Sequence, residues 1–133
     1  MTGAGQMIRL ARPDTQIVAT EPAGASLLAG KPWAPHKIQG WTPDFIPGVL
    51  DKEVAHRIVP VTDVEAIEAA RSLARSEGIF CGISSGGTFA AALKVAAEAP
   101  AGSVILAMLP DTAERYLSTA LFEGIAEGSD PEP

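Results

Sequence analysis

Residues 82–87, with the sequence GISSGG, concentrate the residue types best suited to binding a ligand. They follow a short apolar run at residues 79–81 and precede an alanine-rich stretch typical of a helix. Glycines let the backbone approach a ligand closely, and serine hydroxyls with free amides at a helix N-terminus bind anions or heteroatoms. The segment therefore predicts a polar binding site, although a helix cap with a tight turn would use the same residues.

The same residues match G-x-S-x-G, the nucleophile motif of serine hydrolases, with Ser84 as its serine. In those enzymes the base histidine follows the serine, whereas both histidines here, His36 and His56, precede it. We therefore expect no Ser84 nucleophile. His36 fits a loop hydrogen-bonding residue and His56 a surface residue. Since no carboxylates stand near them at ligand spacing, we also predict no metal site.

Composition limits the classes of function. The chain has 133 residues, 47% hydrophobic and 20% charged, which fits one globular domain. Its net charge of -6 opposes binding to nucleic acid or to an anionic membrane, and no apolar run approaches the roughly 20 residues of a spanning helix. Without a signal-like N-terminus, a cytoplasmic protein is expected. The single cysteine, Cys81, predicts a buried small hydrophobe and no internal disulfide.

Hydrophobic patterns predict the elements that position the GISSGG segment. The clearest is a helix that begins at a capping box, Thr62 with Glu65, and ends at Gly78. Its apolar stripe is Val64, Ile67, Ala70 and Leu73 with Ala74. Strands are expected at residues 16–20, 57–61, 79–81 and 103–109, and further helices at 3–12, 88–98 and 113–117. This alternation predicts an α/β fold with a mainly parallel sheet flanked by helices.

Residues 21–50 contain five prolines and several glycines, so long regular elements are not expected there. A loop of this length inside a compact domain is usually functional or disordered. Its aromatic side chains, including Trp33 and Trp41, indicate ordered packing.

Three segments together carry a family resemblance: PHKIQG at 35–40 with DFIP at 44–47, CGISSG at 81–86, and ERYLSTALF at 114–122. In order and spacing they resemble the C-terminal part of cysteine synthase (O-acetylserine sulfhydrylase), a pyridoxal-phosphate enzyme of the tryptophan-synthase-β-like group. The resemblance covers residues 1–122 and includes IVATEP at 17–22. Only the acidic tail, 123–133, stands outside it, and we expect that tail to be frayed.

The resemblance implies that the chain is part of the large domain of a fold-type II pyridoxal-phosphate enzyme. The family reaction is β-replacement of O-acetylserine by sulfide, which gives L-cysteine and acetate. By resemblance, Ser84 bonds the pyridine nitrogen of the cofactor, with Gly82, Ser85 and Gly86 beside it. A neutral hydroxyl there stabilises a protonated ring less than a carboxylate would, which favours elimination and replacement. The substrate loop corresponds to Gln39, Gly40 and Trp41.

The family's Schiff-base lysine and its substrate-carboxylate loop lie upstream of any segment present here. None of Lys31, Lys37, Lys52 and Lys94 occupies the lysine's position. We therefore expect no catalytic residue in this chain and no activity of the chain alone. A helix that begins at the initiator Met also hints at a missing upstream part. Because the family forms homodimers, we expect a homo-oligomer or association with a complementing N-terminal half.

Two alternatives remain at the level of sequence. Cystathionine β-synthase, or another β-family lyase, would share the serine site, although the PHKIQG and ERYLST segments favour the sulfhydrylase. A non-catalytic binding or regulatory module would explain the absence of the lysine.

Overall fold

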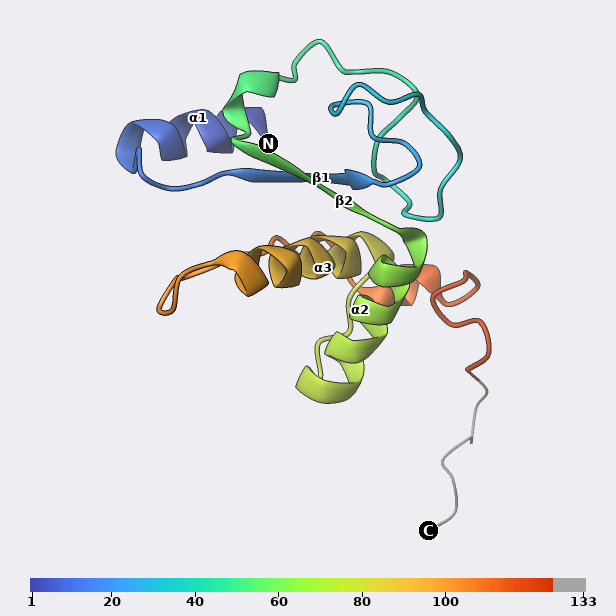
Figure 1. Ribbon diagram of the computed structural model, residues 1–133. Helices are drawn as coiled ribbons and strands as arrows, with labels where there is room; N and C mark the ends of the chain where they lie inside the picture. The colour runs from blue at the N-terminus through green and yellow to red at the C-terminus, as the bar shows by residue number, and fades with distance from the viewer. Residues whose placement is uncertain (126–133) are drawn as a thin grey trace.

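The computed structural model describes residues 1–125 (Figure 1). Two parallel strands, β1 (Val18–Pro22) and β2 (Arg57–Val61), form a sheet, and α2 (Asp63–Glu77) packs closely against α3 (Ile83–Glu98). Helix α3 lies along one face of the sheet, while α1 (Thr2–Ala11) contacts the 3₁₀ helix η1 (Lys52–Val54). A second 3₁₀ helix, η2 (Ala113–Tyr116), follows later in the chain. The predicted α/β class with a parallel sheet is confirmed.

The two strands pair in register from Val18 opposite Arg57 to Pro22 opposite Val61. Strand β2 has the predicted bounds, whereas β1 begins two residues later than predicted and extends to Pro22. Val59 and Val61 are buried against the helices, as expected for β-branched residues on the covered face of a sheet.

Helix α2 is capped as its sequence predicts. The Thr62 hydroxyl accepts from the amide of Glu65, the Glu65 carboxylate accepts from the amide of Thr62, and Gly78 ends the helix in the left-handed conformation with φ of 68°. The buried stripe differs in part from the prediction, since Val64 is exposed. Ala70 and Leu73 are buried as predicted, together with Ala66, which the predicted stripe did not include.

Helix α3 begins at Ile83, about a turn before the predicted start near Thr88. The glycines that suggested a turn lie inside the helix because they allow close packing. A Cβ at Gly86 would lie 2.0 Å from the carbonyl oxygen of Ala66, so the backbones of α2 and α3 meet here. Tertiary packing therefore overrides the low helix propensity of glycine.

Two predicted strands are not formed within the described residues. At residues 79–81 the structure has only an isolated antiparallel bridge between Cys81 and Thr112. Residues 103–109 pair with no strand among residues 1–125, although the sequence predicts a central strand there. A strand needs a neighbour, and no neighbour for this segment lies in the described part of the chain.

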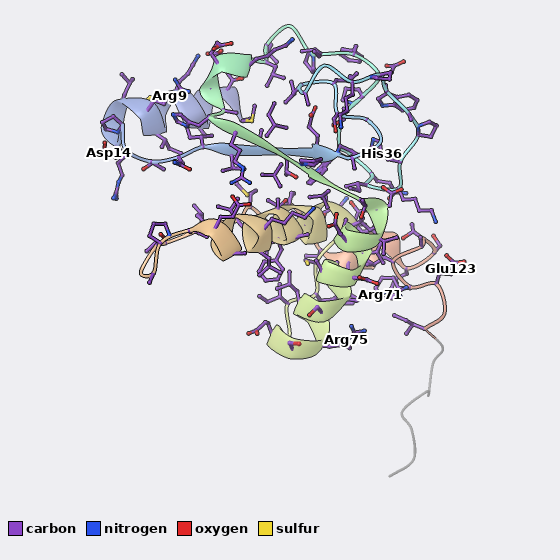
Figure 2. The ribbon with its side chains drawn as sticks, viewed as in Figure 1. Arg9, Asp14, His36, Arg71, Arg75 and Glu123 are labelled. Atoms are coloured by element: carbon purple, nitrogen blue, oxygen red, sulfur yellow. The ribbon has the colours of Figure 1, made fainter. Side chains whose placement is uncertain are left out.

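The chain also has long segments outside the helices and strands, and hydrogen bonds from side chains hold the last of these in place. Residues 23–51 form no helix or strand in the structure, as predicted. The Arg71 guanidinium on α2 donates to the carbonyl oxygens of Ala120, Leu121 and Glu123, which ties the end of the described chain to the helix (Figure 2). Most of the predicted frayed tail lies outside the described residues. Across residues 1–125, no helix has the length and apolar character to cross a membrane.

Candidate functional site

The candidate site is the first turn of α3, where Ser84 lies. Ser84 is buried, and its hydroxyl makes no hydrogen bond to another group within residues 1–125. The amides of the first helical turn have no partners within the helix, and that turn contains no acidic side chain. A free hydroxyl beside the positive end of a helix can bind an electron-rich atom of a ligand.

The neighbouring serine has a structural role. Ser85 is fully buried, and its hydroxyl donates to the backbone oxygen of Asp111 at 3.3 Å. The amide of Gly82 donates to the same oxygen at 3.2 Å. Gly82 and Ser85 are three residues apart and thus share a face, which is directed to Asp111. Of the two serines, only Ser84 has a hydroxyl left for a ligand.

The substrate-loop residues meet this turn through Trp41. A Cβ on Gly87 would lie 2.7 Å from the Trp41 ring, so the ring lies directly on the helix backbone. Since Gly87 is three residues after Ser84, both lie on one face of α3. Gln39 and Gly40, which has φ of 84°, are exposed beside the ring. The structure thus brings Trp41, one of the three predicted substrate-loop residues, to the face of α3 that carries Ser84.

Hydrogen bonds and burial fix the shape of this loop. Trp33 Nε1 donates to the carbonyl oxygen of Thr42 at 3.0 Å, and His36 Nε2 lies 3.4 Å from the same atom. Ile38 is fully buried in the core and anchors the loop. Trp41 is therefore held in place before any ligand binds.

Sequence reasoning missed Asp111 and Tyr116, which close the site behind Gly82. The Tyr116 hydroxyl donates to Asp111 Oδ2, while Asp111 Oδ1 is buried with no partner among the described residues. A Cβ on Gly82 would lie 2.3 Å from Asp111 Oδ1. The hydrogen bond to Asp111 and burial raise the pKa of Tyr116 above its ordinary value. The available signal was the position of Asp111 directly after the apolar run and Pro110.

The other candidate residues have local explanations. Burial raises the pKa of the Cys81 thiol, as the predicted buried hydrophobe requires. His56 Nδ1 accepts from the amide of Ile17 at 2.9 Å and so helps join the strands. No group of three His, Cys, Asp or Glu side chains able to hold a metal ion occurs in residues 1–125.

A cavity of about 160 Å³ lies between β1 and residues 42–50, away from Ser84. Its lining includes Thr20, Leu28 and Phe45, and none of the predicted cofactor residues. The buried carboxylate of Glu21 at this position accepts from the amides of Leu28 and Ala29, which fixes the turn after β1. These hydrogen bonds give the buried Glu21 a structural role beside the cavity.

Similarity to known proteins agrees with this geometry. The O-ureido-L-serine synthase of Streptomyces lavendulae is 56% identical over 98% of this chain and 40% of its own length. A cysteine synthase of Staphylococcus aureus is 40% identical over 92% of this chain and 39% of its length. The crystal structure of an O-ureido-L-serine synthase superposes on 96% of this chain and 40% of that one, with a TM-score of 0.93 and 56% identity.

The chain thus spans about two fifths of the length of these relatives. The family described as "Pyridoxal-phosphate dependent enzyme" matches residues 1–111, which include the strands, α2, α3 and the Ser84 turn. Since the match covers most of the chain, the protein belongs to the pyridoxal-phosphate-dependent enzyme family.

Proposed function

We propose that this chain forms the ring-nitrogen side of a pyridoxal phosphate site, in an enzyme that replaces the β-substituent of O-acetylserine. The observation that carries the proposal is the hydroxyl of the largely buried Ser84, which has no hydrogen-bond partner within residues 1–125 and lies on the same face of α3 as the Trp41 ring. This arrangement offers one hydrogen-bonding group for a heterocycle and one apolar wall beside it.

The residues present fit the cofactor. A pyridine nitrogen accepts one hydrogen bond, and the Ser84 hydroxyl has one to donate. Ser85 cannot compete, because its hydroxyl is engaged with Asp111. Gly82 and Gly86 contribute by allowing close packing of the turn against its neighbours, since a Cβ at either position would clash.

When bound, the cofactor supplies the electron sink that lets the β-substituent leave and a nucleophile replace it. The chain's own part is positioning. Ser84 orients the ring through a neutral hydrogen bond, and the helix N-terminus adds a fixed dipole. We propose that Gln39 and Gly40 contact the amino acid substrate, and that Trp41 limits the access of water from that side.

The relatives suggest two different nucleophiles that could attack the β-carbon. The 40% identity to cysteine synthase supports sulfide, which gives L-cysteine. The 56% identity to O-ureido-L-serine synthase supports an oxygen nucleophile, and hydroxyurea would give that product by the same replacement. We propose β-replacement as the shared reaction and these two acceptors as its candidates.

The site needs groups beyond this chain. We propose that the chain corresponds to the C-terminal part of the fold, and that the Schiff-base lysine comes from the remaining part. Whether that part is covalently continuous or a separate polypeptide, the active protein would form a homo-oligomer or a complemented assembly. The four lysines of this chain would then have no catalytic role.

Two chimeras test the proposal. In the first chimera, this chain replaces the segment that it matches in the S. lavendulae synthase. In the second chimera, it replaces the matching segment of the S. aureus cysteine synthase. Each receives O-acetylserine with sulfide, hydroxyurea or homocysteine, and products are identified by mass spectrometry. We expect both to bind pyridoxal phosphate and form a replacement product. If both chimeras use the same acceptor although their parent enzymes use different ones, this chain determines the acceptor specificity.

The parent enzymes, assayed in the same way, are the controls. Folded chimeras that bind no cofactor and form no product would contradict the proposal and favour a non-catalytic module. A product only with homocysteine would favour a cystathionine β-synthase activity instead.

A further inference from the structure

The backbone of Thr42 has a conformation that its side chain disfavours. Thr42 has φ of 33°, and among residues 1–125 it is the one residue other than glycine with a positive φ. A β-branched side chain crowds the backbone in this region, and the proline that follows, Pro43, favours extended backbone at the residue before it. The local sequence therefore opposes this conformation, and contacts from other residues must hold it.

Two side chains from the preceding part of the loop hold Thr42 through its carbonyl oxygen. Trp33 Nε1 donates to this oxygen at 3.0 Å, and His36 Nε2 lies 3.4 Å from it (Figure 2). A carbonyl oxygen has two lone pairs and can accept from both rings. The Trp33 and His36 rings also pack edge to face, with their centroids 6.4 Å apart. We call these two rings and the carbonyl of Thr42 the loop clamp.

The second nitrogen of His36 indicates which tautomer completes the clamp. His36 Nδ1 is buried and has no hydrogen-bond partner among the described residues. A proton on Nδ1 would be a buried donor without an acceptor, whereas a proton on Nε2 has the Thr42 oxygen beside it. The neutral ring with its proton on Nε2 therefore fits this position, and both rings donate to one carbonyl.

Packing on the far side of the loop leaves room for movement. Thr42 and Pro43 line the cavity of about 160 Å³ beside β1. A densely packed wall would hold the loop by itself, but an open space allows a disfavoured backbone to relax toward it. The clamp is therefore the contact that prevents this relaxation.

The clamp acts directly beside the candidate site. Trp41 precedes Thr42 in the chain, and its ring lies against Gly87, on the face of α3 that carries Ser84. A change in the backbone of Thr42 would therefore displace the Trp41 ring from this face.

We propose that Trp33 and His36 are positioning residues for the amino acid substrate. They hold Thr42, and Thr42 in turn holds the Trp41 ring against α3. This inference rests on the proposed function, in which the loop at residues 39–41 contacts the substrate. A loop that already has its bound conformation loses little freedom when the substrate binds. The clamp therefore strengthens substrate binding and leaves the chemical step unchanged.

The first measurement follows Trp41 in the 133-residue chain without cofactor. The sequence has two tryptophans, so labelling with fluorotryptophan gives two fluorine NMR signals, and Trp33→Phe leaves that of Trp41 alone. This variant removes the hydrogen-bond donor and keeps an aromatic ring. We expect the Trp41 signal to shift toward its position in urea. Phe45→Leu, which changes an exposed aromatic residue of the same loop, is the matched control and should leave the signal in place.

Thr42→Gly separates positioning from a general loss of packing. Glycine adopts positive φ without crowding, so the loop with Gly at this position no longer needs the clamp. We expect Trp33→Phe to shift the Trp41 signal when Thr42 is present, and to shift it little in the Thr42→Gly background. Lost packing at Trp33 would shift the signal equally in both backgrounds.

The second measurement is the kinetics of the S. lavendulae chimera with O-acetylserine, at a saturating concentration of the acceptor that it uses. We expect Trp33→Phe to raise the KM for O-acetylserine at least about threefold and to leave kcat within about twofold, because only the ordering of the loop changes. Adding Thr42→Gly should lower the KM again. Phe45→Leu should have the KM of the parent chimera.

Several results would overturn the proposal. One is a Trp41 signal that already has its urea position in the wild type, or that Trp33→Phe leaves unchanged. Another is an equal shift in the Thr42→Gly background. In an active chimera, an unchanged KM or a loss confined to kcat would do the same. A chimera that forms no product contradicts the proposed function instead, and the fluorine signals then still test whether the clamp holds Trp41.

Discussion

The hydroxyl of Tyr116 donates to Oδ2 of Asp111 at 2.5 Å, directly behind the first turn of α3. The backbone oxygen of Asp111 accepts from Gly82 and from the Ser85 hydroxyl. One residue thus connects η2, which contains Tyr116, to the turn that presents Ser84. The position of the candidate cofactor hydroxyl depends on this connection.

Tyr116 is the only tyrosine in the sequence, so its ionisation can be followed by absorbance. The bond to Asp111 raises its pKa, and we expect a midpoint above the ordinary value of 10.0. A raised pKa stabilises the folded state below the unfolded value, and that stability is lost as pH rises through the folded value. Asp111→Asn should lower the midpoint. An unchanged midpoint in that variant would show that the carboxylate does not cause the shift.

Gly86 is where the backbones of α2 and α3 meet, and Gly86→Ala should therefore destabilise the chain. Its Cβ would lie 2.0 Å from Ala66 O and 2.7 Å from Ala70 N, and backbone atoms cannot move aside easily. We expect a loss of about 1–3 kcal/mol in the free energy of unfolding, measured in urea. Gly3→Ala is the matched change in α1, where no atom lies within 4 Å, and should cost nothing. Equal effects would contradict the proposed close approach.

Glu65 gives α2 a pH-dependent cap. Lys94 at 2.8 Å and the Thr62 amide lower the pKa of Glu65 below its ordinary value of 4.5. A lowered pKa gives stability that is present above the unfolded value and lost as pH falls through the folded one. Glu65→Gln should flatten the loss of unfolding free energy below pH 4.5. Glu68→Gln, on an exposed residue of the same helix, should leave the curve as in the wild type.

Cys81 should react slowly with thiol reagents. Burial raises its pKa above 9.0 and also limits access. At pH 8 we expect labelling of the native chain to be at least about tenfold slower than labelling in denaturant, because reaction requires local opening. Since the sequence has one cysteine, the rate is read without ambiguity. Equal rates in the two conditions would place the thiol at the surface.

Short sequence motifs predict the helix ends correctly where tertiary packing favours the same conformation. The capping box at Thr62 and the left-handed Gly78 are encoded within a few residues, and both are present as predicted. The start of α3 could not be found this way, because Gly86 and Gly87 favour a turn locally. They are helical because the backbone of α2 and the ring of Trp41 occupy the space that side chains would need.

The candidate site was predicted in part. Ser84 and the loop at 39–41 are predicted from a motif and a resemblance, and the structure places the Trp41 ring against Gly87, on the face of α3 that carries Ser84. The position of Asp111 after the apolar run and Pro110 is a weak signal, and its contacts with Gly82 and Ser85 could not be predicted because they span more than 25 residues. Residues 103–109 have the apolar pattern of a buried strand, but no neighbouring strand for them lies within residues 1–125, and the predicted strand is not formed there.

The most direct test of the account is the affinity of the S. lavendulae chimera for pyridoxal phosphate with and without the Ser84 hydroxyl. The cofactor is removed and titrated back while absorbance is recorded, in the chimera and in its Ser84→Ala and Ser118→Ala variants. Loss of one hydrogen bond of about 0.5–1.5 kcal/mol predicts a Kd roughly two- to tenfold higher for Ser84→Ala. Ser118→Ala, on an exposed serine, should match the parent. Identical Kd values and spectra for Ser84→Ala and the parent would contradict the assignment of Ser84 to the cofactor.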